Sequence, residues 1–340
     1  MKNIKFIIAC FALILVGVVY KTFFWSSSSQ PLSTVATDLP IVAITQIVEH
    51  QSLDQEREGF IKALSDAGYE DGKNIKIIYQ NAQGNLGVAA QIVTQLLGHK
   101  PKVMVAISTP SAQAALAPCL NQKVPLVFTA VTDPVGAKLV KDFTNKTDPV
   151  TGVSDALPIA SQVELIKQLV PGIKSLGIVY NPGEINSIKM VQLLKEVLVL
   201  ENITLVEATA SKTSDVSAAV TSLVDKVQAL YIPNDNTAVA AMKSIALVAE
   251  RHKIPLFAGD VGSVMAGALA TKGYDRHELG KKVGEHVVKI LQGTDAATLS
   301  VLINHPLHVF VNVQTAARIG IVLPDAFLKT AHIVGEEGRG

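Results

Sequence analysis

Cysteine and tryptophan are scarce in this chain of 340 residues. The two cysteines are Cys10 and Cys119, and the one tryptophan is Trp25. Because Cys10 lies in an apolar N-terminal run, the rest of the chain holds a single cysteine and no intrachain disulfide is possible there. The sequence therefore excludes a disulfide-stabilised scaffold, and Cys119, which has no motif around it, is expected to pack in the core.

Charge is also sparse, and its two signs are balanced. Charged residues make up 17% of the chain and hydrophobic residues 49%, which excludes a disordered protein. Three lysines and no acid precede residue 35, so the remainder carries 27 basic and 29 acidic residues. This balance gives no basic surface for DNA or RNA, and no nucleic-acid partner is expected. The length fits one large domain or two packed lobes.

The signatures of common enzymes are missing from the sequence. It contains no G-x-G-x-x-G, no G-x-x-x-x-G-K-[ST], no G-x-S-x-G and no H-E-x-x-H motif. The closest histidine pair, His305 and His308, has no acidic or cysteine neighbour at ligand spacing. We therefore expect no enzymatic activity, no metal and no cofactor.

The N-terminus has the pattern of an export segment. Two lysines precede fifteen residues without a charge, Phe6 to Tyr20. Such a pattern is typical of a secretory signal or of an uncleaved membrane anchor, and the residues leave both open. We predict a signal peptide or anchor at residues 1–25 and a polar linker at 26–39. The protein is then exported, and either periplasmic or anchored to the outer face of the cytoplasmic membrane.

From residue 41 onward, short β-rich runs alternate with amphipathic segments of helical length. This alternation predicts α/β architecture with parallel sheets. The predicted strands are Ile41 to Ile47, Asn74 to Tyr79, Val103 to Ile107, Pro125 to Val131, Ser175 to Tyr180, Ile203 to Ala208, Gln228 to Ile232 and Ile254 to Ala258.

Eight strands divide into four and four at a polar stretch, Lys141 to Val150, so two doubly wound parallel-sheet lobes are expected. A tail follows, with a strand at Gly267 to Thr271, a helix at Glu278 to Leu291, an extended run at His308 to Val313 and a short helix at Val313 to Ile319. Such a tail suggests that the chain recrosses between the lobes. The expected limits are 40–150 plus about 263–303 for the first lobe and 151–262 plus about 304–335 for the second.

Hydroxyl-rich loops follow two strands of the first half. Ser108, Thr109 and Ser111 follow one strand, and Thr132 and Asp133 follow the next. Free backbone N–H groups at such helix starts favour a carboxylate or phosphate. The alternative is that these hydroxyls are ordinary helix caps.

Loops in the second half carry amides and acids instead. Tyr180 and Asn186 belong to the loop after one strand, and Asp235 opens a helix after another, where it is suited to an ammonium group or to a simple N-cap. Asp260 lies between Gly259 and Gly262, glycines that suit a chain crossing. Ligands of open parallel sheets bind beyond the carboxyl ends of the strands, where all these residues lie.

Together the loops resemble the substrate-binding proteins of ABC transporters in the tryptophan/tyrosine-type family. The similarity spans about Ile41 to Pro324 and rests on the runs QIVEH at 46–50, AQG at 82–84, STPSAQ at 108–113, VTDPV at 131–135, TGVSD at 151–155, YNPGE at 180–184 and NDNT at 234–237. The resemblance implies a type I periplasmic-binding fold, with three crossings between the lobes, and an amino acid, often aromatic, as the ligand. Its partner would be a membrane permease.

The resemblance also implies roles for single residues. Ser108, Thr109 and Thr132 would hold the ligand carboxylate and Asp235 its ammonium group. The other residues expected at the ligand site are Gln46, Ser111, Asp133, Ser154, Tyr180, Asn186, Asn236, Thr237 and Asp260. One run departs from the family, since Arg276 and His277 stand where two aromatic residues are usual.

Three other functions compete with the solute receptor. A transcription regulator of the same fold would need a helix-turn-helix before Ile41, where the export segment lies instead. A hydrolase or racemase would need a nucleophile paired with a base, and the loops offer only hydroxyls and acids. An extracytoplasmic ligand-sensing domain of a signalling system remains the alternative, because an anchored receptor suits it equally well.

Overall fold

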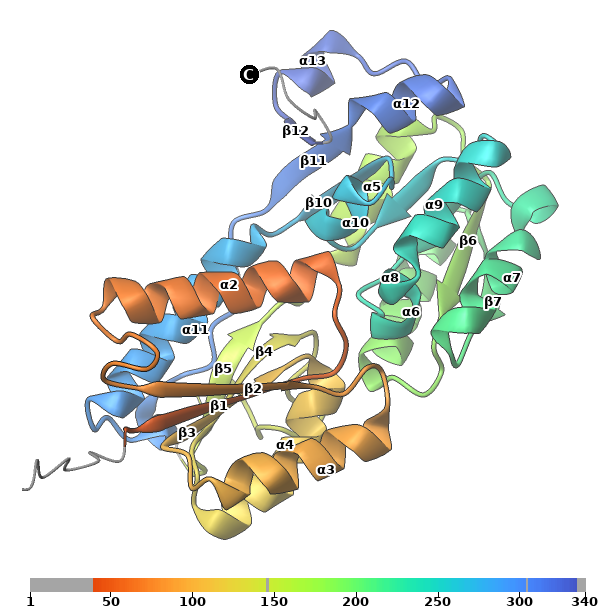
Figure 1. Cartoon of the computed structure of the whole chain (residues 1–340). Helices are drawn as coiled ribbons and strands as arrows, with labels where there is room; N and C mark the ends of the chain where they lie inside the picture. Colours follow the sequence, from red (N-terminus) through yellow and green to blue (C-terminus); the bar gives the residue numbers. More distant parts are fainter. Residues whose placement is uncertain (1–38, 145–146, 304, 335–340) are drawn as a thin grey trace, which may run out of the picture. The chain divides into compact units, whose positions relative to one another are not determined.

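The computed structural model describes residues 39–144, 147–303 and 305–334. Two β-sheets form the cores of two α/β lobes (Figure 1). The predicted signal or anchor at 1–25, and the predicted linker at 26–39 apart from its last residue, lie outside the described residues. Within the described ranges, no helix combines the length and the apolar character needed to cross a membrane.

The first sheet has five parallel strands in the order β2-β1-β3-β4-β5. Every residue of the central strand β3 is buried, as expected for a parallel sheet covered on both faces. Helices α2 and α11 pack together on one face, and α3 and α4 cover the other (Figure 1). The elements of this first lobe are β1 (Ile41–Gln46), α2 (Gln51–Asp66), β2 (Lys76–Asn81), α3 (Leu86–Gly98), β3 (Val103–Ile107), α4 (Thr109–Gln122), β4 (Leu126–Val131), β5 (Val150–Ser154) and α11 (Arg276–Leu291).

The second sheet has seven strands in the order β12-β11-β10-β9-β8-β6-β7, and β11 runs antiparallel to β10. Helices α5 and α6 pack on one face, while α7 and α9 pack together on the other. The elements of this second lobe are α5 (Ile159–Leu169), β6 (Ser175–Tyr180), α6 (Ile185–Leu200), β7 (Thr204–Thr209), α7 (Val216–Thr221), β8 (Ala229–Ile232), α8 (Asn236–Ala240), α9 (Met242–Arg251), β9 (Leu256–Ala258), α10 (Val261–Met265), β10 (Ala270–Gly273), β11 (His308–Asn312), α12 (Val313–Ile319), α13 (Asp325–Leu328) and β12 (His332–Val334). Short 3-10 helices cover Thr213–Asp215, Val224–Lys226 and Ala296–Thr298.

The chain passes between the lobes three times, which confirms the predicted number of crossings. The crossings lie between β5 and α5, between β10 and α11, and between Leu302, which bridges to β5, and β11. The sheets divide the chain differently from the predicted limits at two points. Strand β5 begins at the predicted boundary, Val150, but belongs to the first sheet, and β10 belongs to the second sheet although it lies within 263–303.

The predicted crossing at Gly259 to Ser263 is wrong, because α10 and β10 follow it within the second lobe. The two glycines serve close approach instead of a bend. A Cβ on Gly259 would lie 2.4 Å from the Asn234 side-chain oxygen, and one on Gly262 would lie 2.5 Å from Ser52 Oγ. The chain crosses at Tyr274 and Asp275, directly before α11.

All eight predicted strands are present within two residues of their expected starts. The predicted strand at Gly267 to Thr271 is β10, displaced by three residues, and the predicted helices at 278–291 and 313–319 correspond to α11 and α12. Strands β5 and β12 were not expected. Strand β5 has the sequence VTGVS, whose polar residues and glycine hide its full burial.

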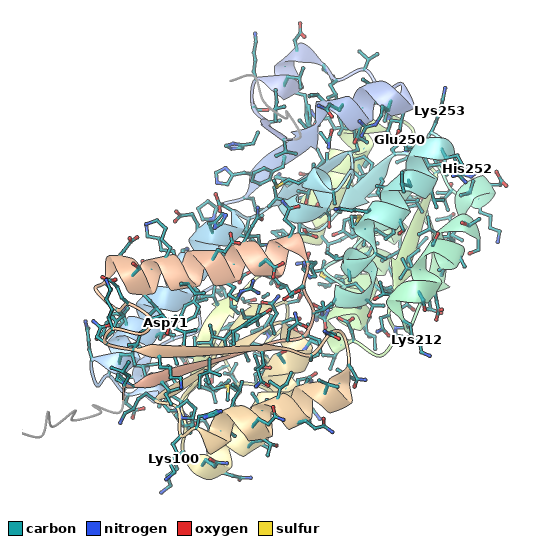
Figure 2. The ribbon with its side chains drawn as sticks, viewed as in Figure 1. Asp71, Lys100, Lys212, Glu250, His252 and Lys253 are labelled. Atoms are coloured by element: carbon teal, nitrogen blue, oxygen red, sulfur yellow. The ribbon has the colours of Figure 1, made fainter. Side chains whose placement is uncertain are left out.

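Large aromatic side chains lie in the sheet cores, and many charged side chains lie on the surface. Phe128 and Tyr231 are fully buried, so they are core residues. Figure 2 shows labelled side chains of both signs, among them Asp71, Lys100 and Lys212, on the outside of the lobes. Several buried polar side chains, among them Ser108, Thr132 and Asp235, lie at one pocket between the two sheets.

Candidate functional site

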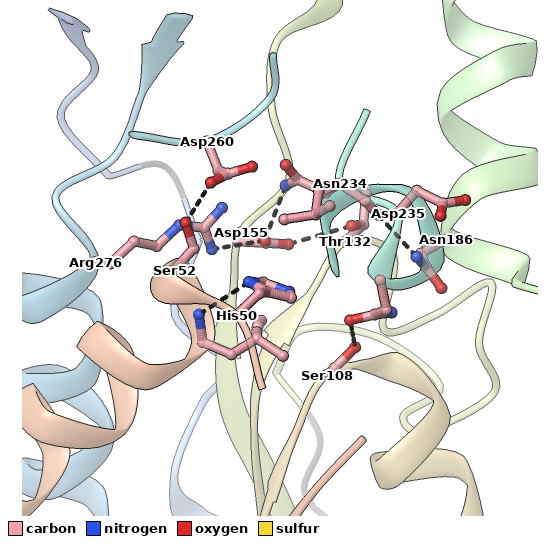
Figure 3. A pocket seen from close by; sticks show the side chains of 14 residues that line it. His50, Ser52, Ser108, Thr132, Asp155, Asn186, Asn234, Asp235, Asp260 and Arg276 are labelled. Carbon is pink, nitrogen blue, oxygen red and sulfur yellow. Dashed lines mark hydrogen bonds and ion pairs between the residues drawn. The ribbon is translucent and has the colours of Figure 1, made fainter. Parts of the chain in front are cut away.

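A pocket lies where the carboxyl ends of strands from both sheets face each other. Its first-lobe residues follow β3, β4 and β5 or open α2 and α11, and its second-lobe residues follow β8 and β9 or open α6. This position agrees with the rule for open parallel sheets. The lining residues are His50, Ser52, Leu53, Ser108, Ala130, Thr132, Asp155, Asn186, Asn234, Asp235, Asn236, Val239, Asp260 and Arg276 (Figure 3).

The pocket is nearly closed. Its cavity volume, counted as the space open to the centre of a water molecule, is about 20 Å³. This is roughly the space that one buried water needs. Side chains of the two lobes therefore meet across it.

Three hydrogen-bonded contacts tie the two sides of the pocket together. Ser108 Oγ, after β3, donates to Asn236 Oδ1, which opens α8, at 2.8 Å. At the start of α2, Ser52 Oγ donates to Asp260 Oδ1, the cap of α10. Finally, Asn234 Nδ2 donates to Asp155 Oδ2 at 2.9 Å (Figure 3).

Six of the thirteen residues predicted at the ligand site line this pocket. They are Ser108, Thr132, Asn186, Asp235, Asn236 and Asp260. All six lie directly after a strand, or at the N-cap or in the first turn of a helix. The rule that ligands bind beyond the carboxyl ends of the strands was therefore enough to predict them.

Five other predicted residues lie close to the pocket without lining it. Ser154 Oγ donates to the Thr132 carbonyl from behind, at 3.4 Å. The buried hydroxyls of Thr109 and Ser111 have no partner among the described residues. Two more residues line crevices next to the pocket, Asp133 beside Lys189 and Thr237 beside Glu184.

Gln46 and Tyr180 point elsewhere. The Gln46 amide donates to Asp54 Oδ1 and accepts from Arg57, so it fixes the start of α2. The Tyr180 hydroxyl donates to Glu207 on the neighbouring edge strand β7. Neither Gln46 nor Tyr180 is among the residues that line this pocket.

Five polar lining residues were not predicted at the site, and these are His50, Ser52, Asp155, Asn234 and Arg276. His50, Asp155 and Asn234 belong to the recognised runs QIVEH, TGVSD and NDNT, so the family resemblance contained them. Arg276 was noted only as a departure from the family. Ser52 lies in the first turn of α2, outside every recognised run. Burial lowers the pKa of His50, which favours its neutral form.

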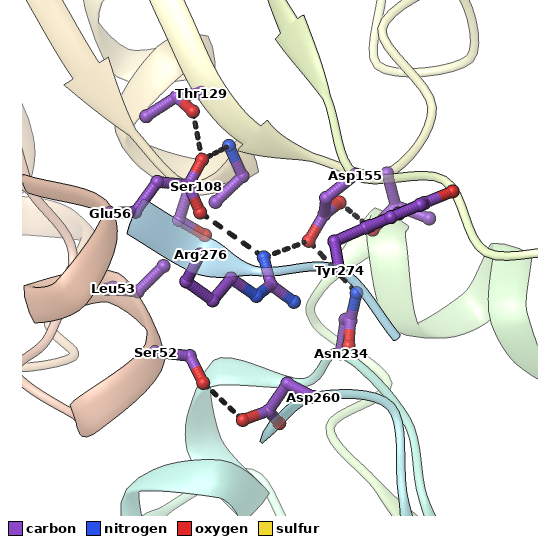
Figure 4. A network of polar contacts seen from close by, with 12 residues as sticks. Ser52, Leu53, Glu56, Ser108, Thr129, Asp155, Asn234, Asp260, Tyr274 and Arg276 are labelled. Carbon is purple, nitrogen blue, oxygen red and sulfur yellow. Dashed lines mark hydrogen bonds and ion pairs between the residues drawn. The ribbon is translucent and has the colours of Figure 1, made fainter. Parts of the chain in front are cut away.

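A buried ion network forms one wall of the pocket (Figure 4). Arg276 Nη1 donates to Glu56 Oε2 at 3.2 Å and to Asp155 Oδ2 at 2.9 Å. Glu56 also accepts from Thr129 Oγ1 and from the backbone N–H of Ala130. Burial raises the pKa of Glu56, and the Arg276 charge offsets only part of that.

Two non-glycine residues of the pocket have left-handed backbone angles. Ser108 has φ of +83° and Ala130 has φ of +51°. Such strain is held by the surrounding structure and concentrates at functional sites. Ser108 directly follows β3, and Ala130 lies at the carboxyl end of β4.

Asp235 caps helix α8 and is fully enclosed. Its Oδ1 accepts from the Ala238 N–H at 2.7 Å, and its Oδ2 accepts from the Asn181 N–H and from Ser187 Oγ, both at 2.6 Å. Burial, and then the nearby Glu184 carboxylate, raise the pKa of Asp235 to about 7. The N-cap expected as one alternative is therefore present, and the same carboxyl group also borders the pocket.

This raised pKa makes a prediction for stability. The folded state keeps a proton on Asp235 that the unfolded state releases near its ordinary pKa, so this residue's contribution is complete below about pH 4 and is lost as the pH rises through about 7. Asp235→Asn removes that contribution. The free energy of unfolding of the variant minus that of the parent should rise between pH 4.5 and 7.5 in urea melts. A pH-independent difference would contradict the assignment.

The charges of the pocket are mainly negative. Asp155, Asp235 and Asp260 line it, and Arg276 is the one lining side chain that is always positive. In the part of the chain that the structure describes, no group of three or more His, Cys, Asp and Glu side chains is placed to hold a metal ion. The site offers carboxylates, amides and hydroxyls for hydrogen bonding to a small molecule.

Known proteins resemble this chain over most of its length. Residues 41–334 match the family model described as ABC transporter substrate binding protein. A tyrosine-binding protein of Clostridioides difficile is 42% identical over 290 residues, which are 85% of this chain and 84% of the relative.

Two solved structures share the fold and the family resemblance. An ABC domain from Streptococcus pneumonia in complex with L-Trp is 32% identical and superposes with a TM-score of 0.83 over 87% of this chain and 99% of that one. A substrate-binding protein with adhesive properties from Clostridium difficile, in its ligand-free, open structure, is 36% identical, with a TM-score of 0.66 over 88% and 100%. The match covers both lobes and every strand that borders the pocket, so this chain belongs to the family of ABC transporter substrate-binding proteins.

Proposed function

We propose that this protein is an exported receptor that captures an amino acid between its two lobes and delivers it to the permease of an ABC transporter. The observation that carries the proposal is the pocket itself. It is bridged by hydrogen bonds between the lobes and has room for about one water. A larger ligand can enter only when the lobes separate, and closure then buries it.

The comparison of the two solved structures supports a closed conformation. The open, ligand-free relative is slightly more similar in sequence than the L-Trp complex, yet it superposes less well, with a TM-score of 0.66 against 0.83. Sequence divergence does not account for this order. We infer a different angle between the lobes, because hinge closure is the motion expected of such proteins.

The two ends of an amino acid fit different walls of the pocket. We infer that the carboxylate lies at the start of α4, a helix of 14 residues, beside Ser108, Thr109 and Thr132. The buried Thr109 hydroxyl, which has no partner in the part of the chain that the structure describes, supports this placement. The ammonium group then lies on the acidic side, near Asp235 and Asp155.

A screen of the twenty amino acids by thermal shift tests the proposal. A ligand that binds only the folded protein raises its melting temperature in proportion to the logarithm of its concentration. Calorimetric titration of the hits should give one site per chain. If no amino acid raises the melting temperature at millimolar concentration, the proposed ligand class is wrong.

Closure predicts a specific effect at Gly262. An alanine Cβ there would lie 2.5 Å from Ser52 Oγ and 2.9 Å from the Ser52 backbone nitrogen, across the closed pocket. Gly262→Ala should therefore weaken ligand binding about tenfold, or about 1.4 kcal/mol, with little change in the free energy of unfolding.

Gly98→Ala is the matched control for this variant. Gly98 ends helix α3, and apart from its chain neighbours and the adjoining helix backbone no heavy atom of the described residues lies within 4 Å of the added Cβ. Calorimetric titration should give the parent's affinity for Gly98→Ala. If Gly262→Ala binds the ligand as tightly as Gly98→Ala does, the lobes do not close over the ligand as proposed.

A further inference from the structure

Arg276 uses only one of its three guanidinium nitrogens for hydrogen bonds to the described residues. Nη1 makes both hydrogen bonds to the carboxylates of Glu56 and Asp155. Nε is buried and has no partner among the described residues. Nη2 likewise makes no hydrogen bond to the part of the chain that the structure describes. The edge formed by Nε and Nη2 is thus unused, although the residue is only 3% exposed.

This unused edge belongs to a residue that lines the pocket. Figure 3 shows the Arg276 guanidinium pointing into the space between Ser52, Asp155 and Asp260. The Nε and Nη2 edge of an arginine is a rigid fork that suits an oxygen acceptor. A buried donor without an acceptor costs free energy, and the residual space is about that of one water. A ligand oxygen at this position would remove the cost.

The charges around Arg276 limit what that oxygen can belong to. Glu56 and Asp155 already balance the guanidinium charge, and Asp260 lies on its other side (Figure 4). A carboxylate placed there would face Asp155 and Asp260 as a like charge, which disfavours binding. A hydroxyl or carboxamide oxygen accepts the same hydrogen bonds without that repulsion.

We propose that Arg276 determines ligand specificity by donating from Nε and Nη2 to a neutral oxygen, a hydroxyl or a carboxamide, at the end of the ligand side chain. This inference rests on the proposed function and names the class of amino acid that the site prefers. The apolar lining residues Leu53, Ala130 and Val239 contact the carbon part of the side chain.

Matched pairs of amino acids test the inference on the parent protein by calorimetric titration. The pairs are L-tyrosine with L-phenylalanine, L-threonine with L-valine, and L-glutamine with L-glutamate. In at least one pair the member with the neutral oxygen should bind at least about tenfold more tightly, because its partner leaves buried donors unpaired or adds a like charge. If the two members of every pair bind within threefold of each other, or if glutamate binds more tightly than glutamine, the inference is overturned.

The variant Arg276→Lys separates recognition from a purely structural role. Lysine keeps the positive charge beside Glu56 and Asp155 but lacks the fork. The affinity ratio within the preferred pair should fall from at least about tenfold to below about threefold. A structural role alone would weaken both members equally and leave the ratio unchanged, which would overturn the inference. If the variant does not fold, the pairs on the parent protein still decide.

The same titrations distinguish failure of the inference from failure of the proposed function. If amino acids bind but only those without a neutral side-chain oxygen do so, the receptor function stands and the role of Arg276 is wrong. If no amino acid binds, both are wrong.

Discussion

Arg276→Met should lower the free energy of unfolding by about 3 to 5 kcal/mol, because it removes one partner of a buried ion network. Methionine fills a similar volume without a charge, so packing changes little. Glu56 and Asp155 remain buried at 0% and 3% exposure, and both lose their positive neighbour. Urea melts followed by circular dichroism measure the change.

The loss should grow with pH. The pKa of Glu56 is already raised by burial, and removal of Arg276 raises it further. A group whose folded pKa is raised contributes stability at low pH and loses it as the pH rises through that pKa. The deficit of Arg276→Met should therefore be smaller at pH 5 than at pH 8.

The double variant Glu56→Gln with Arg276→Met is the matched control. Glutamine keeps an oxygen for Thr129 Oγ1 and the Ala130 N–H, but it carries no charge to be left unpaired. We expect it to recover part of the stability that the single variant loses, with a coupling between the two sites of about 0.5 to 3 kcal/mol. If Arg276→Met alone lowers the free energy of unfolding by less than about 1 kcal/mol, the ion network is not important for the stability of the fold.

Much of the fold follows from local patterns. The eight predicted strands are short apolar runs between helical segments, and burial of such runs in parallel sheets leaves little alternative. Strand β5 was not predicted because Thr151 and Gly152 break its apolar pattern. Its burial depends on a tertiary contact: a Cβ on Gly152 would lie 2.2 Å from the Phe128 carbonyl oxygen. No local pattern reports such a contact.

Site residues that directly follow strands could be predicted from the sequence. Site residues that depend on contacts between distant helices could not. Ser108, Thr132 and Asp235 are hydroxyls or acids placed directly after strands, so chemistry and position agree. Arg276 and Glu56 are 220 residues apart, and only the packing of α2 against α11 brings them together. That packing depends on glycines, since a Cβ on Gly280 would lie 2.0 Å from the Glu56 carbonyl oxygen.

Asp235→Ala should weaken amino-acid binding by about 2 to 5 kcal/mol if its carboxylate faces the ligand ammonium in the closed pocket, because the ammonium is then left buried without its partner. The same change removes the acceptor of the Ala238, Asn181 and Ser187 donors. Folding stability should therefore also fall, by about 1 kcal/mol for the lost cap and about 1 to 3 kcal/mol for the other buried donors.

A control variant at a buried helix cap outside the pocket separates the loss of affinity from the loss of stability. Asn312 caps α12 by accepting from the Thr315 N–H, is 4% exposed, and lies outside the set of pocket residues. Asn312→Ala should reduce stability in urea melts while leaving the calorimetric affinity unchanged. Asp235→Ala should reduce both.

Thr132→Ala completes the comparison at the opposite end of the ligand. The Thr132 hydroxyl donates to Asp155 Oδ1 in this structure and would have to turn to the ligand carboxylate on binding. The start of α4 keeps its backbone N–H groups in the variant, so a smaller loss of about 1.5 to 3 kcal/mol in affinity is expected. Should Asp235→Ala bind the amino acid as tightly as the parent does, its carboxyl group serves only to cap α8. The ammonium group would then have to be assigned to Asp155, a lining carboxylate whose Oδ1 accepts, among the described residues, only from the Thr132 hydroxyl, at 3.2 Å.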